Sequence, residues 1–248
     1  MTNQALTTVN APEMALASPD DAALFGLDQM DRSDQIIPRV RLAQLMSNLP
    51  GADPGEFHNN VTGNAMKEFI AVILRVSKGR VMWPDQYARE QEPLCASDNS
   101  RAPREKYAGI YDLGKGCAQC PMSVWGEEGQ TPFCSLAYTY LGIDFTTGLP
   151  FLISLSRTSA KTAKQLNTLF AGYTITHAFK FSVSELITGE KGRWYEARVA
   201  DAGKVDDPAR FMALARQFAG RAISTDTGPE GEGTLSAEDM AAEEDLPF

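Results

Sequence analysis

The alternation of apolar and polar residues predicts a chain built mainly of β-strands. Residues 69–74 form an unbroken apolar run, and residues 81–83 form a second one after a Lys78-Gly79 pair, which favours a tight hairpin between two strands. Further strands are predicted at residues 136–145, 151–155, 179–183 and 193–200. An extended segment at residues 36–42 opens the ordered part of the chain.

Two helices interrupt the strands. Ser159 is a favourable N-cap for a helix to about residue 171, and Asp207-Pro208 pairs a capping side chain with a proline at the first helical position. Strands, one helix and two more strands follow the order of the OB fold, a barrel of three strands, a helix and two strands. One strand too many precedes the helix, so either the first strand is long and bent or residues 81–83 belong to an insertion. We expect a mainly β (α+β) domain, an OB-fold-like barrel of five to six strands with two helices.

The two ends of the chain differ from its middle in charge. Residues 1–35 hold six acids and one Arg, and residues 222–248 hold eight acids and no Lys or Arg. Residues 36–221 keep 22 basic and 18 acidic residues, a formal charge of +4 within a chain of −9. We therefore expect a disordered arm at 1–35, a folded domain at 36–221 and a disordered acidic tail at 222–248. A basic body with acidic ends is typical of a nucleic-acid binder, although acidic ends also promote solubility.

All four cysteines fall in residues 84–134, which lack strand or helix periodicity and are expected to form an inserted loop. Their spacing is Cys-x21-Cys-x2-Cys-x13-Cys, made by Cys95, Cys117, Cys120 and Cys134. A Cys-x2-Cys pair can bind one ion from a tight loop, and two distant cysteines then complete a tetrahedral sulfur site that suits structural Zn²⁺. An iron–sulfur cluster, disulfides or unrelated thiols are the alternatives. Four protein sulfurs leave no open position on the metal, so no catalytic role is expected for it.

Binding of single-stranded nucleic acid requires cations for phosphates and flat rings for unstacked bases. Alternation places Tyr138 and Tyr140 opposite the apolar positions of their strand, and Trp194 is a third candidate for stacking. The phosphate candidates are cationic residues on faces predicted to be polar: Arg75, Lys78, Arg80, Arg157, Lys161, Lys164, Lys180, Lys191, Arg193 and Arg198. Further rings in or beside the insertion are Trp83, Tyr107, Tyr111 and Trp125. For any one of these residues, core packing or a solvated surface is the competing interpretation.

The last residues are Glu243, Glu244, Asp245, Leu246, Pro247 and Phe248. An apolar ring beside the α-carboxylate suits a pocket with an apolar floor and a basic edge. This stretch resembles the acidic C-terminal tip of bacterial and phage single-stranded DNA-binding proteins. The body, with Ile37-Pro38-Arg39, Thr62-Gly63 and the four-cysteine insertion, is similar to phage-encoded proteins of that kind. Leu246 stands where the bacterial tip usually has Ile.

The resemblance implies a protein without enzymatic activity that coats single-stranded DNA in replication, recombination or repair. Its tip would recruit partner enzymes and compete for the basic groove when DNA is absent. Self-association is a further expectation. The alternatives are a nuclease with a four-cysteine metal cluster and a zinc-containing adaptor that binds only protein. No apolar stretch is long enough for a membrane helix and no signal pattern opens the chain, so we expect a soluble protein in the cytoplasm of a bacterial host.

Overall fold

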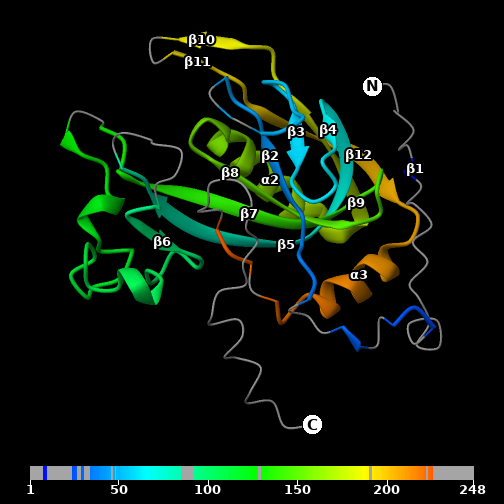
Figure 1. The fold of residues 1–248 in the computed structure, drawn as a ribbon, viewed down its shortest axis with the longest axis horizontal. Helices are drawn as coiled ribbons and strands as arrows, with labels where there is room; N and C mark the ends of the chain where they lie inside the picture. Colours follow the sequence, from blue (N-terminus) through cyan, green and yellow to red (C-terminus); the bar gives the residue numbers. More distant parts are fainter. Residues whose placement is uncertain are drawn as a thin grey trace.

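The computed structural model describes residues 8–9, 24–26, 29–30, 34–45, 47, 49–84, 92–127, 130–189, 192–221 and 223–225. Within them the protein is mainly β, and a ten-stranded sheet curls into a half-barrel (Figure 1). The strands of this sheet are β1 (Thr8–Val9), β2 (Arg39–Leu42), β3 (Phe57–Asn59), β4 (Ala65–Met66), β5 (Glu68–Met82), β6 (Cys95–Ser97), β7 (Cys134–Asp144), β8 (Pro150–Ser156), β9 (His177–Val183) and β12 (Ala197–Val205). A separate hairpin joins β10 (Ile187–Gly189) to β11 (Gly192–Trp194), and two α-helices are α2 (Ala160–Tyr173) and α3 (Pro208–Gln217).

The longest strand, β5, runs from the body of the sheet into the insertion, beside β7 for most of its length (Figure 1). The predicted hairpin at Lys78-Gly79 is therefore wrong, and the alternative of one long bent strand is confirmed. Gly79 is needed for close packing instead of a turn, because a Cβ there would overlap the side chain of Thr225. A register shift between Ile73 and Arg75 bends the strand.

The order of pairing explains how the sheet curls. The first half of β5 pairs with β9 on one side and β7 on the other, and β7 continues to β8. Helix α2 connects β8 to β9, and β9 pairs with β12. On its other edge β8 pairs in parallel with β2, which leads to β3 and β4. The sheet thus ends at β4 on one side. On the other side it ends at β12, to which only the two residues of β1 are added.

Helix α2 covers part of the open edge of β12. Ser159 Oγ accepts a hydrogen bond from the Ala197 amide, Thr162 Oγ1 donates to the Ala197 carbonyl, and Gln165 Nε2 donates to the Val199 carbonyl. These bonds satisfy backbone groups that a neighbouring strand would otherwise pair. Ser159 occupies the N-cap position as predicted, but its hydroxyl makes no cap bond because it is used by β12.

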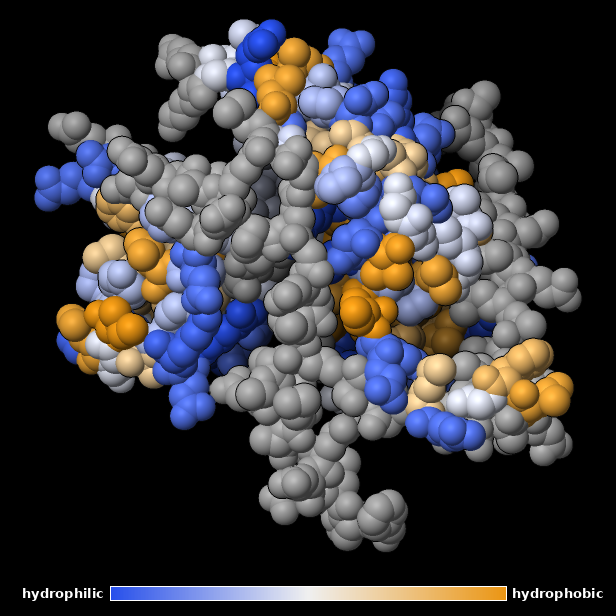
Figure 2. Space-filling model, in the orientation of Figure 1, coloured by the Kyte–Doolittle hydropathy of each residue, from blue (hydrophilic) through white to orange (hydrophobic). Residues whose placement is uncertain are grey.

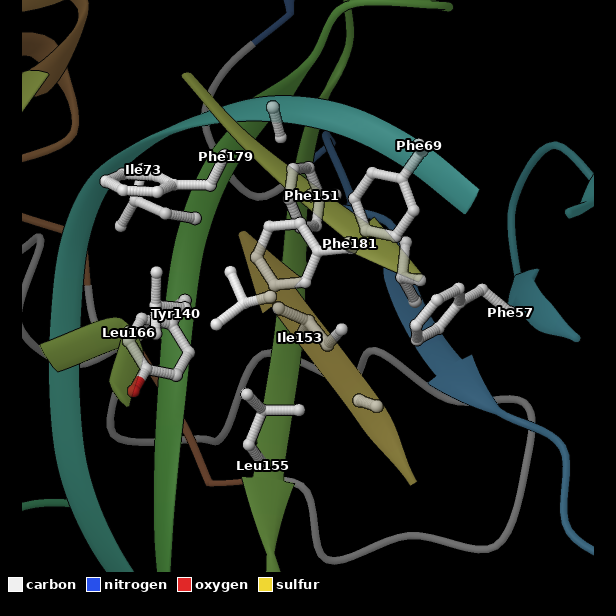
Figure 3. Close-up of a cluster of buried hydrophobic side chains, with 14 of the residues drawn as sticks. Phe57, Phe69, Ile73, Tyr140, Phe151, Ile153, Leu155, Leu166, Phe179 and Phe181 are labelled. Carbon is white, nitrogen blue, oxygen red and sulfur yellow. The ribbon is translucent and has the colours of Figure 1, made fainter. Parts of the chain in front are cut away.

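The inner core lies on the concave face of the sheet and is rich in phenylalanine (Figure 3). Phe69 stacks on Phe181 with ring centroids 4.8 Å apart and meets Phe57 and Phe151 edge-on. Such pairs add to the burial energy of each ring. The alternation predicted for residues 179–183 is confirmed, since Phe179 and Phe181 both point into this core.

An outer core lies on the opposite face, where α3 packs through Phe211 and Leu214. The start of α3 is as predicted, because Asp207 accepts a hydrogen bond from the Arg210 amide and Pro208 follows it. Since both faces of the sheet are covered, residues on either side of β5 and β7 are buried. This is why alternation alone does not tell which face meets solvent.

Both ends of the chain fall largely outside the described residues. Residues 226–248 of the predicted tail and most of the predicted arm lie outside the described residues, so these expectations stay predictions there. The predicted tail begins at residue 222, however, and Ile223 and Thr225 within it are buried. Thr8–Val9 form β1, which pairs in parallel with Lys204–Val205, so the arm is not without regular structure at this point. In the described chain, no helix is long and apolar enough to cross a membrane.

Candidate nucleic-acid interface and cysteine cluster

The second half of β5 carries cations beside an aromatic residue of β7. Lys78 lies directly opposite Tyr138, and Arg80 lies opposite Leu136. Facing residues of an antiparallel pair point to the same side of the sheet, so these side chains continue the concave face beyond the inner core. Lys78 is exposed, while Tyr138 is half-buried and packs against the inner core with one side.

The end of β8 and the first turns of α2 add three cations to this part of the molecule. Ser156 pairs with Ala137 of β7, and the next residue, Arg157, is exposed with a φ of 46°. Lys161 and Lys164 project from the exposed side of α2. We call the set Lys78, Arg80, Tyr138, Arg157, Lys161 and Lys164 the candidate interface.

The β10–β11 hairpin carries Arg193 and Trp194, which the structure places near the start of α2. The link is the segment after β11, where Ala197 bonds to Ser159 and Thr162. The backbone of Tyr195 is held by both side-chain amide atoms of Gln44, at 2.9 Å each. Trp194 donates from Nε1 to Glu196 at 3.1 Å. The hairpin and the insertion both project to the left in Figure 1.

Besides the two residues of the hairpin, four predicted DNA-binding residues in the described chain lie outside the candidate interface. Tyr140 is fully buried, and its hydroxyl lies 3.0 Å from the Ala163 carbonyl and 2.8 Å from Asn167 Oδ1. Burial raises the pKa of its hydroxyl. Its expected role in base stacking is therefore wrong: the strand alternates as predicted, but the curled sheet and α2 enclose this ring.

Arg75 is turned to the other face of the sheet. Its guanidinium donates to the Phe218, Ala219 and Arg221 carbonyls at the end of α3, so it caps that helix. Lys180 is paired with Glu68 at 2.8 Å, and Arg198 is exposed on β12, opposite Ser182. Lys180 faces Ile70, eight residues away from Lys78 on β5, and Arg198 lies one strand further away. Lys191 and the tip residues 243–248 fall outside the described residues.

The four cysteines are free thiols, all buried, in one region of the molecule. Met82 of β5 lies between Cys95 of β6 and Cys134 of β7, directly opposite each of them. These three residues form a small apolar cluster with Ala96 and Tyr107. Contrary to the expectation of an irregular insertion, two of the cysteines therefore lie on strands of the main sheet.

Cys117 and Cys120 lie on a turn that several polar groups hold in place. Ser123 donates from its hydroxyl to the carbonyls of Cys117 and Cys120. The Asp112 carboxylate accepts from the Gly109, Gly114 and Gly116 amides, and these bonds lower its pKa against the opposing effect of burial. Asp112 was not predicted as a site residue. The motif Asp-x-Gly-x-Gly, which is typical of such a turn, is the sequence pattern that could have identified it.

The thiols influence one another electrostatically. Burial, together with the negative charges of Cys134, Cys117 and Cys120, raises the pKa of Cys95 to about 11. Burial also raises the pKa of Cys134, while the Arg80 guanidinium near it acts in the opposite direction. Four thiols are the kind of donor set that zinc takes in structural sites, because each thiolate needs a cation to offset its charge. Among the described residues, however, no three His, Cys, Asp or Glu side chains are already placed to hold a metal ion.

A short segment after α3 connects the insertion to the body, and no local pattern in the sequence predicts this contact. We call residues 223–225 the strap. The Asp98 carboxylate accepts from the Thr225 amide and makes two 2.8 Å bonds with Arg104, whose guanidinium also donates to the Thr225 carbonyl. Arg39 donates to Ser224 from the other side. The strap therefore fixes residues 224 and 225 against both the body and the insertion.

A curled, mainly β domain with a cysteine-bearing insertion is thus the class that the structure defines. The sequence model of a phage protein family, the Pam3 phage gp34-like proteins, matches residues 4–226. The chain belongs to this family. The matched part stops where the strap ends, so the acidic tail lies beyond it. No curated protein and no solved structure matches the chain.

Proposed function

We propose that this protein binds single-stranded DNA through the candidate interface, without catalysing a reaction, in replication, recombination or repair. The observation that carries the proposal is that Lys78 lies directly opposite the half-buried ring of Tyr138, with Arg80 two residues further along β5. The exposed cations Arg157, Lys161 and Lys164 follow the end of β8, where Ser156 pairs with Ala137. A ring for base stacking surrounded by cations for phosphates is the arrangement that sequence-tolerant binding requires. Tyr138 is half-buried and so held in place before the ligand arrives.

The strand order supports an OB-type body. The sequence β5, β7, β8, α2, β9 and β12, with β5 paired to both β7 and β9, follows the three-strand, helix, two-strand order. In OB folds, the loops between strands 1 and 2 and between strands 4 and 5 contact oligonucleotides. The corresponding segments here are the insertion and the β10–β11 hairpin. Both carry aromatic residues and both extend to the same side.

Structural zinc is part of the proposal. Cys95 and Cys134 would supply two thiolates from strand ends, and Cys117 and Cys120 would supply two from the turn organised by Asp112 and Ser123. The ion would offset part of the negative charge of four thiolates that burial alone disfavours. Its contribution is to the folding of the insertion, not to chemistry.

The tail has a separate proposed role. Its sequence, with an acidic run before Leu246-Pro247-Phe248, suits the recruitment of replication or recombination proteins. Because Thr225 is bonded to Asp98 of the insertion, a partner recruited by the tail would be tethered to that region of the molecule. Deletion of residues 246–248 is expected to abolish partner capture and to leave DNA affinity unchanged or increased.

A fluorescence titration with an unlabelled oligo-dT tests the central proposal. Binding is expected to quench tryptophan emission, with affinity falling on added salt by a log–log slope of about −0.7 for each phosphate neutralised. Lys78→Ala is expected to reduce that slope by about one phosphate, whereas Lys180→Ala, at a position facing Ile70 of β5, leaves it unchanged. Absence of binding would favour the adaptor that contacts only protein. Magnesium-dependent cleavage of the oligonucleotide would favour the nuclease.

A further inference from the structure

A cavity of about 210 Å³ opens where β5, β6 and β7 end in the insertion. Its walls are apolar or aromatic residues drawn from the strand ends and from the loops that carry the cysteines. They are Met82, Trp83, Leu94, Tyr111, Met122 and Phe133. This cavity is separate from the candidate interface, none of whose residues lines it.

The cavity has a fixed floor and an exposed edge. Met82 is buried in the insertion cluster, and Tyr111 and Met122 pack against that cluster. Phe133 and Leu94, in contrast, are 62% and 41% exposed. Apolar residues gather at the surface of the insertion, at the left of Figure 2. Large apolar side chains held at the mouth of a concave site, in contact with water, indicate a site for a ligand.

The charges near the cavity restrict what the ligand is. Met82 lies on the same face of β5 as Arg80 and Lys78, two and four residues away, which is about 7 and 13 Å along a strand. The Arg80 guanidinium is fixed by Ser100 Oγ and the Cys134 carbonyl, and Lys78 is exposed. An apolar, aromatic cavity at the end of a row of cations matches a flat base attached to a chain of phosphates.

We propose that this cavity holds one unstacked base of single-stranded DNA, with the adjoining phosphates on Arg80 and Lys78. The inference rests on the proposed function and specifies one contact of it. Trp83, Tyr111 and Phe133 supply ring faces, and the thioethers of Met82 and Met122 supply polarisable contacts. Every base has a face that stacks, so the site would accept any of the four.

The test compares two oligonucleotides of equal length and charge, oligo-dT and a fully abasic strand. Phe133→Ser removes an exposed wall of the cavity and is expected to weaken oligo-dT binding roughly tenfold while changing the affinity for the abasic strand little. Leu94→Ser, which alters another wall, is expected to act in the same direction. Lys78→Ala should weaken binding of both strands equally. The matched control is Leu113→Ser, which alters an exposed residue of the insertion that does not line the cavity.

Three results would overturn the inference. In the first, Phe133→Ser and Leu94→Ser weaken both strands equally or neither. In the second, these variants change the oligomeric state in analytical ultracentrifugation while the preference for oligo-dT over the abasic strand stays as in the wild type, which makes the cavity a contact between copies. In the third, the wild-type protein binds neither strand, and then the proposed function fails with it. The first two leave the proposed function standing.

Discussion

The two halves of β5 have the same main partner, β7, but different surroundings. From Glu68 to Ala71 the strand is paired with β9, and the residues of this first half fill the inner and outer cores. From Arg75 to Met82 the β9 pairing is lost, and the strand supports cations, a few buried residues and the cysteine cluster. One continuous strand thus passes from a region with a large apolar core to one with almost none.

The difference indicates that the two regions are stabilised by different means. Burial of aromatic and aliphatic side chains is enough for the body, because its phenylalanines contact one another from several strands. The insertion buries five residues in its own cluster and relies on hydrogen bonds that the Asp112 and Asp98 carboxylates accept and that the Ser123 hydroxyl donates. A small core of this kind needs a metal, disulfide or similar restraint.

Loss of the proposed metal should have the largest effect, and it should be confined to the insertion. The double variant Cys117→Ser, Cys120→Ser removes two of four ligands, and a structural zinc supplies on the order of 10 kcal/mol to the segment it folds. Native mass spectrometry is expected to show one zinc in the wild type and none in the variant. Limited proteolysis is then expected to cut the insertion and spare the body. The control is Ala118→Ser in the same turn, and equal zinc content in all three proteins would contradict the proposal.

The next effect concerns the body alone. Phe69→Ala opens a cavity among Phe57, Phe151 and Phe181 and is expected to lower the free energy of unfolding by about 3–5 kcal/mol. Urea denaturation followed by fluorescence measures it. Phe133→Ala is the same chemical change at a 62% exposed position of the insertion, and its cost should stay below about 1 kcal/mol. Equal costs at the two positions would remove the distinction between the regions.

The strap provides a smaller effect at the boundary between the regions. Asp98→Ala leaves the Thr225 amide and the Arg104 guanidinium without their shared acceptor. Hydrogen bonds to a charged group stabilise by roughly 1.5–3 kcal/mol each, and solvent exposure of Asp98 reduces this to about 1–2 kcal/mol in total. Hydrogen exchange should show faster exchange at residues 97–104 and 223–225, with no change in the inner core. Glu185→Ala, at an exposed carboxylate, is the control.

The smallest effect on stability separates two tyrosines of β7. Tyr140→Phe removes a buried hydroxyl and should cost about 1 kcal/mol, without changing DNA affinity. Tyr138→Ala should instead weaken oligo-dT binding roughly tenfold. Weaker DNA binding by a fully folded Tyr140→Phe protein would contradict this assignment.

The same tyrosine gives a dependence on pH. Burial raises the pKa of Tyr140 above its usual value of 10, so folding favours its neutral form. Its contribution to stability is complete below pH 10 and is lost as the pH rises above that value. Above pH 10, the free energy of unfolding measured by denaturation should therefore fall less steeply with pH for Tyr140→Phe than for the wild type. Equal slopes would mean that the ring is accessible to water.

Sequence alone determined the features that depend on neighbouring residues. Asp207-Pro208 specified the start of α3, and the alternation around Phe179 and Phe181 specified a strand with one apolar face. The order of the strands before and after α2 could also be predicted from the sequence, because each element has its own hydrophobic periodicity. The Cys-x2-Cys turn was visible for the same reason.

Tertiary structure decided which of two possible faces or conformations is used. The residues around Gly79 predict a turn, but Gly79 lies within a strand. It is needed there because Thr225, 146 positions later, packs against it. Tyr138 and Tyr140 have the same pattern in the sequence, but only Tyr140 is enclosed, since α2 closes over its side of the sheet. Periodicity assigns residues to a face, whereas the curl of the sheet and contacts between distant segments decide whether that face meets water.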